Sequence, residues 1–174
     1  MQSAIARVRI IVGAFTEVAL SEMPSQPDRD NAVRLKLNPI KSILEDKHVI
    51  LVDDSIVRGT TSRKIVNLVR QAGAKKVEFW STCPPIISPC FYGVDISTHG
   101  ELIAFKNSIP EIEKHLGVDK LHYQTIEDLA DAIGIKSLCM GCMTERYPTP
   151  IAQSISDKMK IQKNLGGKRY WEVA

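Results

Sequence analysis

The chain has 174 residues and a mass of 19.4 kDa, enough for one domain with a single sizeable core. Hydrophobic residues make up 44% and charged residues 25% of the sequence, which excludes disordered, collagen-like and coiled-coil classes. The net charge of +3 comes from scattered basic residues, a bias too weak to indicate a nucleic-acid partner. No apolar run is long enough for a membrane span or a signal peptide, so we expect a cytoplasmic protein without a membrane partner.

The N-terminal part carries weak structural signals. Residues 1–31 follow neither a helical nor a strand period and contain several polar residues and prolines, which predicts an irregular connection. Residues 33–37 alternate between apolar and charged side chains, which predicts a short half-buried strand. Asn38 and Pro39 have the residue types of a helix N-cap and first helical position, so we expect a short helix through Leu44.

A parallel sheet is predicted by the segment that follows. The apolar run Val49–Val52 is rich in β-branched residues and ends at two aspartates, which is typical of a central strand buried on both faces. The next apolar residues have helical spacing and predict a helix that Gly73 ends: Ile65, Leu68, Val69 and Ala72. Residues 75–80 supply another strand, so strand, helix and strand follow one another as in a βαβ unit.

The second half of the chain repeats the alternation of helices and strands. Three capping-box pairs predict helix starts: Thr98 with Glu101, Ser108 with Glu111, and Thr125 with Asp128. Gly117 and Gly134 are placed to end the second and third of these helices, and residues 121–124 lie between them as a predicted strand. From Ser137 onward no strong period is present, so we expect a loop-rich appendage and a loose tail.

The most informative segment is residues 49–62, VILVDDSIVRGTTS. Its adjacent carboxylates, Asp53 and Asp54, follow a predicted buried strand at the edge where open α/β sheets bind ligands. A loop rich in hydroxyl groups then leads into a helix N-terminus, where free N–H groups and the helix dipole favour a phosphate. We therefore predict a sugar-phosphate site in which the aspartates hold ribose hydroxyls and the loop holds the phosphate.

A purely structural explanation of this segment is also available. Asp53 and Asp54 could end the strand in a turn, and Thr60 or Thr61 could cap the helix. For an acidic pair alone, that explanation is the better one. The whole segment favours the sugar-phosphate hypothesis, because strand, acids, loop and helix follow in the order that such a site requires.

The segment resembles the phosphoribosyl pyrophosphate signature of type I phosphoribosyltransferases. Over residues 29–150, further motifs occur in the same order as in the amidophosphoribosyltransferase family: Arg34-Leu35-Lys36-Leu37-Asn38, Gln71-Ala72-Gly73-Ala74, Pro84-Pro85, Pro89-Cys90-Phe91-Tyr92-Gly93-Val94-Asp95 and Cys139-Met140-Gly141-Cys142. The resemblance implies an α/β class and a partial type I phosphoribosyltransferase fold with a parallel sheet. Residues 29–136 would be the C-terminal part of that domain, residues 1–28 are unmatched, and residues 137–174 form a cysteine-bearing appendage and tail.

The family that this chain resembles forms 5-phosphoribosylamine in de novo purine biosynthesis. Phosphoribosyl pyrophosphate bound to Mg²⁺ loses pyrophosphate while ammonia attacks the anomeric carbon. Asp53 and Asp54 would bind the ribose hydroxyls and Mg²⁺. The loop would bind the 5′-phosphate through Ser55, Arg58, Gly59, Thr60, Thr61 and Ser62. We further expect a homo-oligomer.

The family's ammonia comes from an N-terminal glutaminase domain that uses a catalytic cysteine. No cysteine precedes Cys83, so we expect that domain to be absent from this chain, and no catalytic residue is assigned. The early strands and the closing loop of the phosphoribosyltransferase domain are also missing from the match. The resemblance therefore implies a truncated or frame-disrupted copy, in which turnover suffers more than phosphate binding.

The cysteines allow several interpretations. Cys139 and Cys142 form a C-x-x-C pair, and spacing alone favours zinc or free thiols over an iron–sulfur cluster. The resemblance reverses that order, because the positions of Cys90, Cys139 and Cys142 match three of four [4Fe–4S] ligands in the iron–sulfur type of the family. The fourth ligand lies upstream of the match, so the predicted cluster site is incomplete, and no family pattern supports Cys83 as a substitute.

Two alternative functions follow from the same residues. A regulator could bind phosphoribosyl pyrophosphate without turning it over, but no helix-turn-helix pattern or basic face indicates the output module that such a protein needs. A truncated remnant without activity is the other alternative, and its exposed strand edges would make it prone to association.

Overall fold

The computed structural model describes residues 9–12, 39–96, 98–135 and 137–161. Four parallel strands form one sheet in the order β1-β2-β3-β4: β1 (Arg9–Val12), β2 (His48–Asp53), β3 (Lys76–Ser81) and β4 (Lys120–Tyr123). The helices are α3 (Lys41–Leu44), α4 (Thr60–Gln71), α5 (Ile103–Lys106), α6 (Ile109–Leu116), α7 (Ile126–Ile133), α8 (Gly141–Thr144) and α9 (Pro150–Ile161), with a 3-10 turn, η1 (His99–Glu101), before α5. The predicted α/β class and parallel sheet are confirmed.

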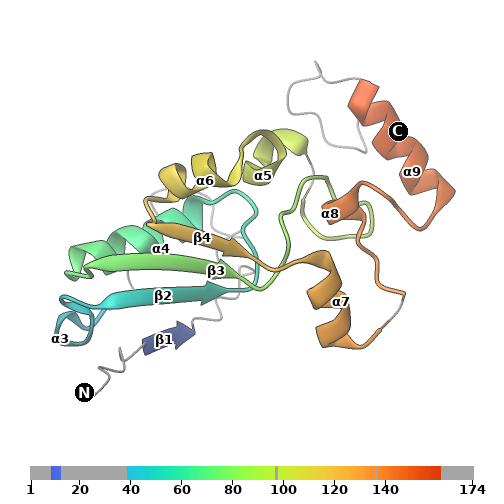
Figure 1. Cartoon of the computed structure of the whole chain (residues 1–174). Helices are drawn as coiled ribbons and strands as arrows, with labels where there is room; N and C mark the ends of the chain where they lie inside the picture. Colours follow the sequence, from blue (N-terminus) through green and yellow to red (C-terminus); the bar gives the residue numbers. More distant parts are fainter. Residues whose placement is uncertain (1–8, 13–38, 97, 136, 162–174) are drawn as a thin grey trace.

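The core lies on one face of the sheet, where α4 and α6 pack (Figure 1). Val49 and Leu51 of β2 are buried there beside Val77 and Phe79 of β3. On the opposite face, the alternate residues of β2 are only half-buried. The prediction that β2 is buried on both faces is therefore wrong for the described residues, because the described helices cover only one face of the sheet.

Local sequence signals set most helix ends. Gly73, with φ +94°, follows the last turn of α4 as predicted. Gly117 and Gly134 end α6 and α7 in the left-handed conformation, also as predicted. At the start of α7, Thr125 Oγ1 accepts a hydrogen bond from Asp128 N–H at 3.0 Å. At the start of α6, both the N–H and the Oγ of Ser108 donate to the Glu111 carboxylate.

The first predicted capping box, Thr98 with Glu101, is not formed. Thr98 precedes η1 without a side-chain capping bond, and Leu102 N–H closes a single 3-10 turn on His99 C=O. The carboxylate of Glu101 bonds to Arg58 instead. The short helix before β2 also starts later than predicted, at Lys41 rather than Pro39, because Ile40 is still extended and its C=O accepts the first helical bonds.

Strand β1 and helices α8 and α9 fall where an irregular chain is expected. Strand β1 lies within residues 1–31 and pairs with β2, but four residues are too few to show a period in the sequence. Helix α9 lies in the predicted loop-rich region. Its buried residues, Ala152 and Ser156, are small, while Ile151 is exposed. The sequence therefore has no apolar stripe that would predict this helix. The strand predicted at residues 33–37 lies outside the described residues.

The C-terminal helices lie beyond the carboxyl ends of the strands. Figure 1 shows α7, α8 and α9 on that side, past the arrowheads of β3 and β4. Backbone bonds from Ile87 and Ser88 to Cys142 C=O, both 2.9 Å, attach α8 to the loop after β3. Within the described ranges, no helix has the length and apolar character needed to cross a membrane.

Candidate functional site

The acidic pair lies at the carboxyl end of β2. Asp53 is the last residue of the strand and is half-buried, while Asp54 is exposed in the loop. Asp54 N–H donates to Asp53 Oδ1 at 3.0 Å, and Ser55 Oγ donates to Asp54 Oδ1 at 3.2 Å. Thr82 supports both residues from the end of β3, since its N–H donates to Asp53 C=O at 3.0 Å and its hydroxyl is 3.4 Å from both carbonyls.

The loop after the acidic pair is fixed from two sides. Ile56 is 2% exposed and anchors the loop in the core. Ile103 N–H donates to Val57 C=O at 2.9 Å, so the start of α5 holds the outer part of the loop. Gly59 then adopts φ +73°, and a Cβ there would stand 2.7 Å from Ile103 Cδ1. Both the backbone angle and the close contact require glycine at this position.

The N-terminus of α4 offers donors to an anion. Within the described part of the chain, the N–H groups of Thr60, Thr61 and Ser62 have no hydrogen-bond partner, whereas Arg63 N–H bonds to Gly59 C=O. The first turn of α4 contains no acidic residue. Unpaired N–H groups and the positive end of the helix dipole together favour a phosphate or another anion.

The predicted substrate residues therefore lie in one continuous segment, from the end of β2 to the first turn of α4. Their side chains differ in accessibility: Arg58 and Thr60 are exposed, Ser55 and Thr61 are half-buried, and Ser62 is buried. Because the Ser62 side chain is buried, this residue contributes its backbone N–H to the row of unpaired donors described above. Arg58 Nη2 donates to Glu101 Oε2 at 3.1 Å.

The sequence motif omits the residues that support this loop from elsewhere in the chain. Thr82, Glu101 and Ile103 all contact it, but they lie in segments that the motif does not include. Glu101 was assigned to a capping box, and the structure pairs it with Arg58. No local pattern signals such contacts between distant parts of a chain.

The cysteines are not grouped as a metal site in the described part of the chain. Cys83, Cys90 and Cys142 are half-buried beside the apolar cluster of Ile86, Ile96 and Leu102, while Cys139 is exposed. Burial raises the pKa of the Cys83 thiol to about 11, and burial also raises the pKa of Cys142. Among the described residues, no three His, Cys, Asp or Glu side chains are grouped to hold a metal. As placed here, the thiols therefore do not form the complete [4Fe–4S] site that the resemblance implies at Cys90, Cys139 and Cys142.

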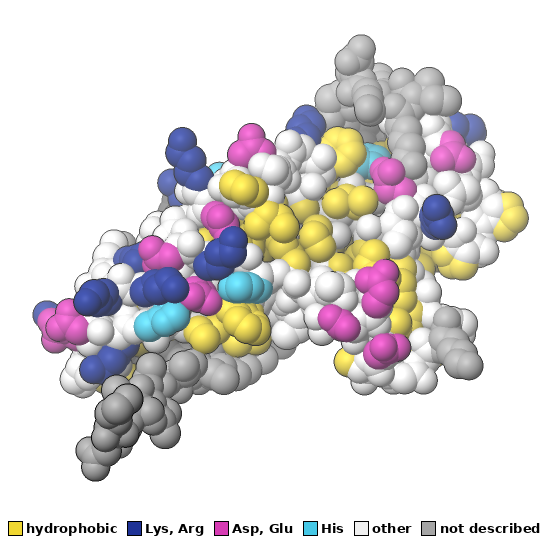
Figure 2. All heavy atoms as spheres, in the orientation of Figure 1, with side chains coloured by type: hydrophobic (Ala, Val, Ile, Leu, Met, Phe, Trp, Pro, Cys, Tyr) yellow, Lys and Arg dark blue, Asp and Glu magenta, His cyan; other side chains and the backbone are white. Residues whose placement is uncertain are grey.

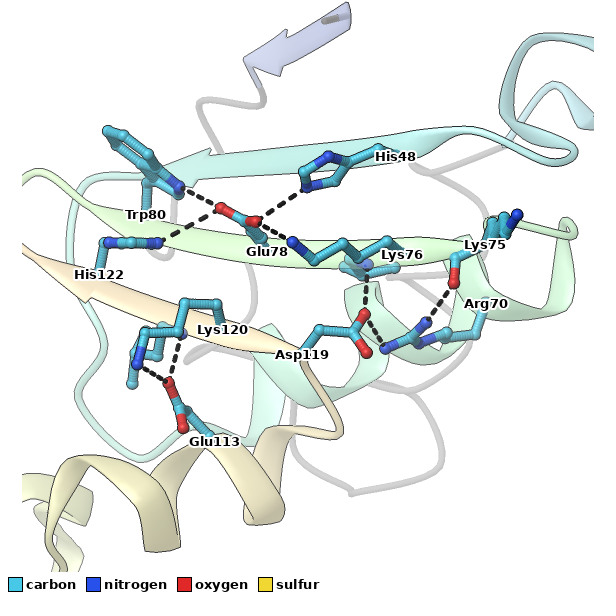
Figure 3. Close-up of polar contacts among 12 residues, drawn as sticks. His48, Arg70, Lys75, Lys76, Glu78, Trp80, Glu113, Asp119, Lys120 and His122 are labelled. Carbon is cyan, nitrogen blue, oxygen red and sulfur yellow. Dashed lines mark hydrogen bonds and ion pairs between the residues drawn. The ribbon is translucent and has the colours of Figure 1, made fainter. Parts of the chain in front are cut away.

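A second polar cluster lies on the face of the sheet opposite α4 and α6 (Figure 3). Glu78 on β3 is its centre: one carboxylate oxygen is 2.7 Å from Lys76 Nζ and 2.9 Å from His48 Nε2. The other oxygen is 3.4 Å from Trp80 Nε1 and 3.3 Å from His122 Nε2. The hydrogen bond from Lys76 is the main cause that lowers the pKa of Glu78 to about 2. In the space-filling view, hydrophobic side chains lie among charged and His side chains over these strands (Figure 2).

No family model matches this chain. An amidophosphoribosyltransferase of Methanocaldococcus jannaschii is 58% identical over 129 residues, which are 74% of this chain and 27% of the relative. That of Bacillus subtilis is 48% identical over 136 residues, covering 75% of this chain and 29% of the relative. This chain is homologous to part of amidophosphoribosyltransferase.

Solved structures agree with this assignment. The glutamine phosphoribosylpyrophosphate amidotransferase from B. subtilis, complexed with ADP and GMP, matches with a TM-score of 0.64 and 47% identity. The match covers 74% of this chain and 30% of that structure. A structure described as the allosteric regulatory enzyme of purine biosynthesis gives the same TM-score and identity. The fold predicted from the resemblance to amidophosphoribosyltransferase is thus confirmed, and the chain spans a little over a quarter of the length of its curated relatives.

Proposed function

We propose that this chain binds phosphoribosyl pyrophosphate and takes part in forming 5-phosphoribosylamine from it, as part of de novo purine biosynthesis. The observation that carries this proposal is the row of unpaired N–H groups at the start of α4, directly after the acidic pair at the carboxyl end of β2. Homology to amidophosphoribosyltransferase, at 58% identity to the M. jannaschii protein, supports the same substrate.

The chain's own residues would have distinct roles in this reaction. The N–H groups of Thr60, Thr61 and Ser62 bind the 5′-phosphate, and they need no rearrangement because the helix already aligns them. Asp53 and Asp54 accept hydrogen bonds from the ribose hydroxyls and fix the sugar in one orientation. The bond from the anomeric carbon to pyrophosphate breaks and a bond to ammonia forms, while the two carboxylates stabilise the cation-like carbon.

The acidic pair also suits a magnesium ion. Mg²⁺ prefers oxygen ligands and commonly takes one or two carboxylates, with water and substrate phosphates at its other positions. Asp53 and Asp54 are the carboxylates beside the loop, and they would hold the ion together with the substrate. When bound, Mg²⁺ supplies positive charge that neutralises the departing pyrophosphate. No step of this proposal uses the [4Fe–4S] cluster, because the described residues contain no group of side chains placed to hold a metal.

One titration tests the proposal. The purified chain is titrated with phosphoribosyl pyrophosphate in a calorimeter, with and without Mg²⁺, and pyrophosphate release is then measured after ammonia is added. Mg²⁺-dependent binding with release supports the enzyme, and binding without release supports the regulator. Absence of both supports the inactive remnant and contradicts the proposal.

A double variant tests the assigned residues. Asp53→Asn with Asp54→Asn keeps the shape of both side chains but removes the charges that would hold Mg²⁺. We expect the Mg²⁺-dependent part of the binding to be lost. Unchanged affinity in this variant contradicts the role given to the acidic pair.

Four further expectations stay predictions: the cytoplasmic location, the homo-oligomeric state, the supply of ammonia by a glutaminase domain, and the domain boundaries at residues 28 and 136.

A further inference from the structure

The phosphate loop contains an ion pair that joins it to a distant segment. Arg58 Nη2 lies 3.1 Å from Glu101 Oε2 of η1. The two side chains are 46% and 42% exposed, respectively, so water reaches both of them. An exposed pair with one hydrogen bond contributes little to stability, because solvent screens it and both side chains lose freedom.

The fold does not depend on this ion pair to hold the two segments together. Ile103 N–H donates to Val57 C=O at 2.9 Å, and the Ile103 side chain packs against Gly59. Both contacts lie within two residues of the ion pair along the chain, and Ile103 is buried. Because these contacts already position η1 and the loop, Arg58 can leave Glu101 without disturbing the backbone.

Arg58 is the basic side chain between the acidic pair and the α4 N-terminus. A phosphate monoester carries more negative charge than one carboxylate and offers several acceptor oxygens, so a guanidinium binds it more strongly. An anion seated on the N–H groups of Thr60 and Thr61 would therefore compete with Glu101 for Arg58.

We propose that Glu101 is a counter-ion that the substrate's phosphate displaces from Arg58. This inference rests on the proposed function of the loop. Without ligand, Glu101 neutralises Arg58 and opposes the entry of weakly charged anions. When a sugar phosphate binds, Arg58 turns to the phosphate and Glu101 is released to solvent. Glu101 is thus a specificity-determining residue that favours ligands with a doubly charged phosphate.

The test is a double-mutant cycle with ribose 5-phosphate as the probe, measured by calorimetry on the full chain at low ionic strength. Glu101→Gln should bind the probe about two- to fivefold more tightly than the wild type, which is the range that an exposed ion pair can supply. Arg58→Ala should bind it more weakly. In the Arg58→Ala background, Glu101→Gln should give no further tightening, because the competition has been removed.

Glu45→Gln is the matched control. It removes the same charge from another exposed ion pair, Lys41–Glu45, which precedes β2 at the opposite end of that strand from the loop. We expect no change in affinity from it. A thermal melt of each variant confirms folding, and Glu101→Ala serves as a second variant that must also tighten binding.

Each possible outcome either supports or overturns the inference. Unchanged or weaker binding by Glu101→Gln and Glu101→Ala overturns it, while binding by the wild type leaves the proposed function standing. Tightening of the same size in the Arg58→Ala background also overturns it, because the effect would then be general repulsion of an anion by a carboxylate. No binding of ribose 5-phosphate or phosphoribosyl pyrophosphate by any variant overturns both this inference and the proposed function.

Discussion

Gly59 and Ile103 contact each other so closely that an added Cβ on Gly59 would stand 2.7 Å from Ile103 Cδ1. Gly59→Ala therefore combines steric overlap with the strain of φ +73°. We expect a loss of stability of about 2–4 kcal/mol in urea unfolding and a loss of ribose 5-phosphate binding.

Two further variants separate these causes. Gly117 has a similar φ of +75° and nothing within 4 Å of an added Cβ, so Gly117→Ala measures strain alone. It should cost about 1 kcal/mol and leave ligand binding intact. In the Gly59→Ala background, Ile103→Val removes the overlapping Cδ1 and should recover part of the lost stability. Equal costs for Gly59→Ala and Gly117→Ala would contradict the proposed overlap.

The Glu78 cluster predicts a pH dependence of stability. The folded pKa of Glu78 is about 2, below its ordinary value of 4.5, so the unfolded chain binds its proton more readily. The stabilisation is therefore fully present above pH 4.5 and declines as the pH falls towards 2. Glu78→Gln should remove this part of the decline in urea unfolding curves recorded from pH 7 to pH 2.

Other carboxylates also contribute to the acid response, so a reference variant is needed. Glu45→Gln removes a carboxyl from the exposed Lys41–Glu45 pair and shows the effect of deleting any surface acid. Glu78→Gln should flatten the curve more than this reference and should also cost about 1 kcal/mol at pH 7, where its ion pair with Lys76 is intact. Parallel curves for the two variants would show that the Glu78 cluster does not depress that pKa.

The sequence was most informative where local signals agreed with one another. The apolar run of β2, the acidic pair and the small-residue loop before α4 each have a short-range physical cause, so their order could be predicted without coordinates. The strands and helix ends around Gly117 and Gly134 were predictable for the same reason.

The remaining features depend on contacts that no local pattern carries. Glu101 has a suitable spacing for a capping box, and only the folded chain brings Arg58 to it from 43 residues away. Helix α9 buries Ala152 and Ser156, whose small side chains leave no hydrophobic period. Ile50 and Val52 were expected to be fully buried because a continuous apolar run does not reveal which face of the sheet has a cover.

A buried hydroxyl attaches the C-terminal part to the loop after β3. Tyr147 OH donates towards Ser88 Oγ at 2.7 Å and Pro89 C=O at 2.6 Å, and all three residues are buried. Tyr147→Phe leaves the carbonyl without this donor, so we expect a loss of about 1–3 kcal/mol in unfolding free energy. Tyr92→Phe is the matched control, because its hydroxyl bonds to Thr149 at an exposed site that water can satisfy. Equal costs for the two variants would contradict the role of burial.

The accessibility of the cysteines predicts their order of modification. Cys139 is exposed, whereas Cys83 is half-buried and burial raises its pKa to about 11, so little thiolate forms there at neutral pH. Under iodoacetamide, mass spectrometry of the native protein should show one fast alkylation at Cys139, and Cys139→Ser should abolish it. Because no three of the described His, Cys, Asp and Glu side chains are grouped to hold a metal, anaerobically purified protein should also contain less than one equivalent of bound iron or zinc, in the wild type and in Cys139→Ser alike. A brown preparation that loses its iron on Cys139→Ser would instead show that the thiols rearrange around a cluster.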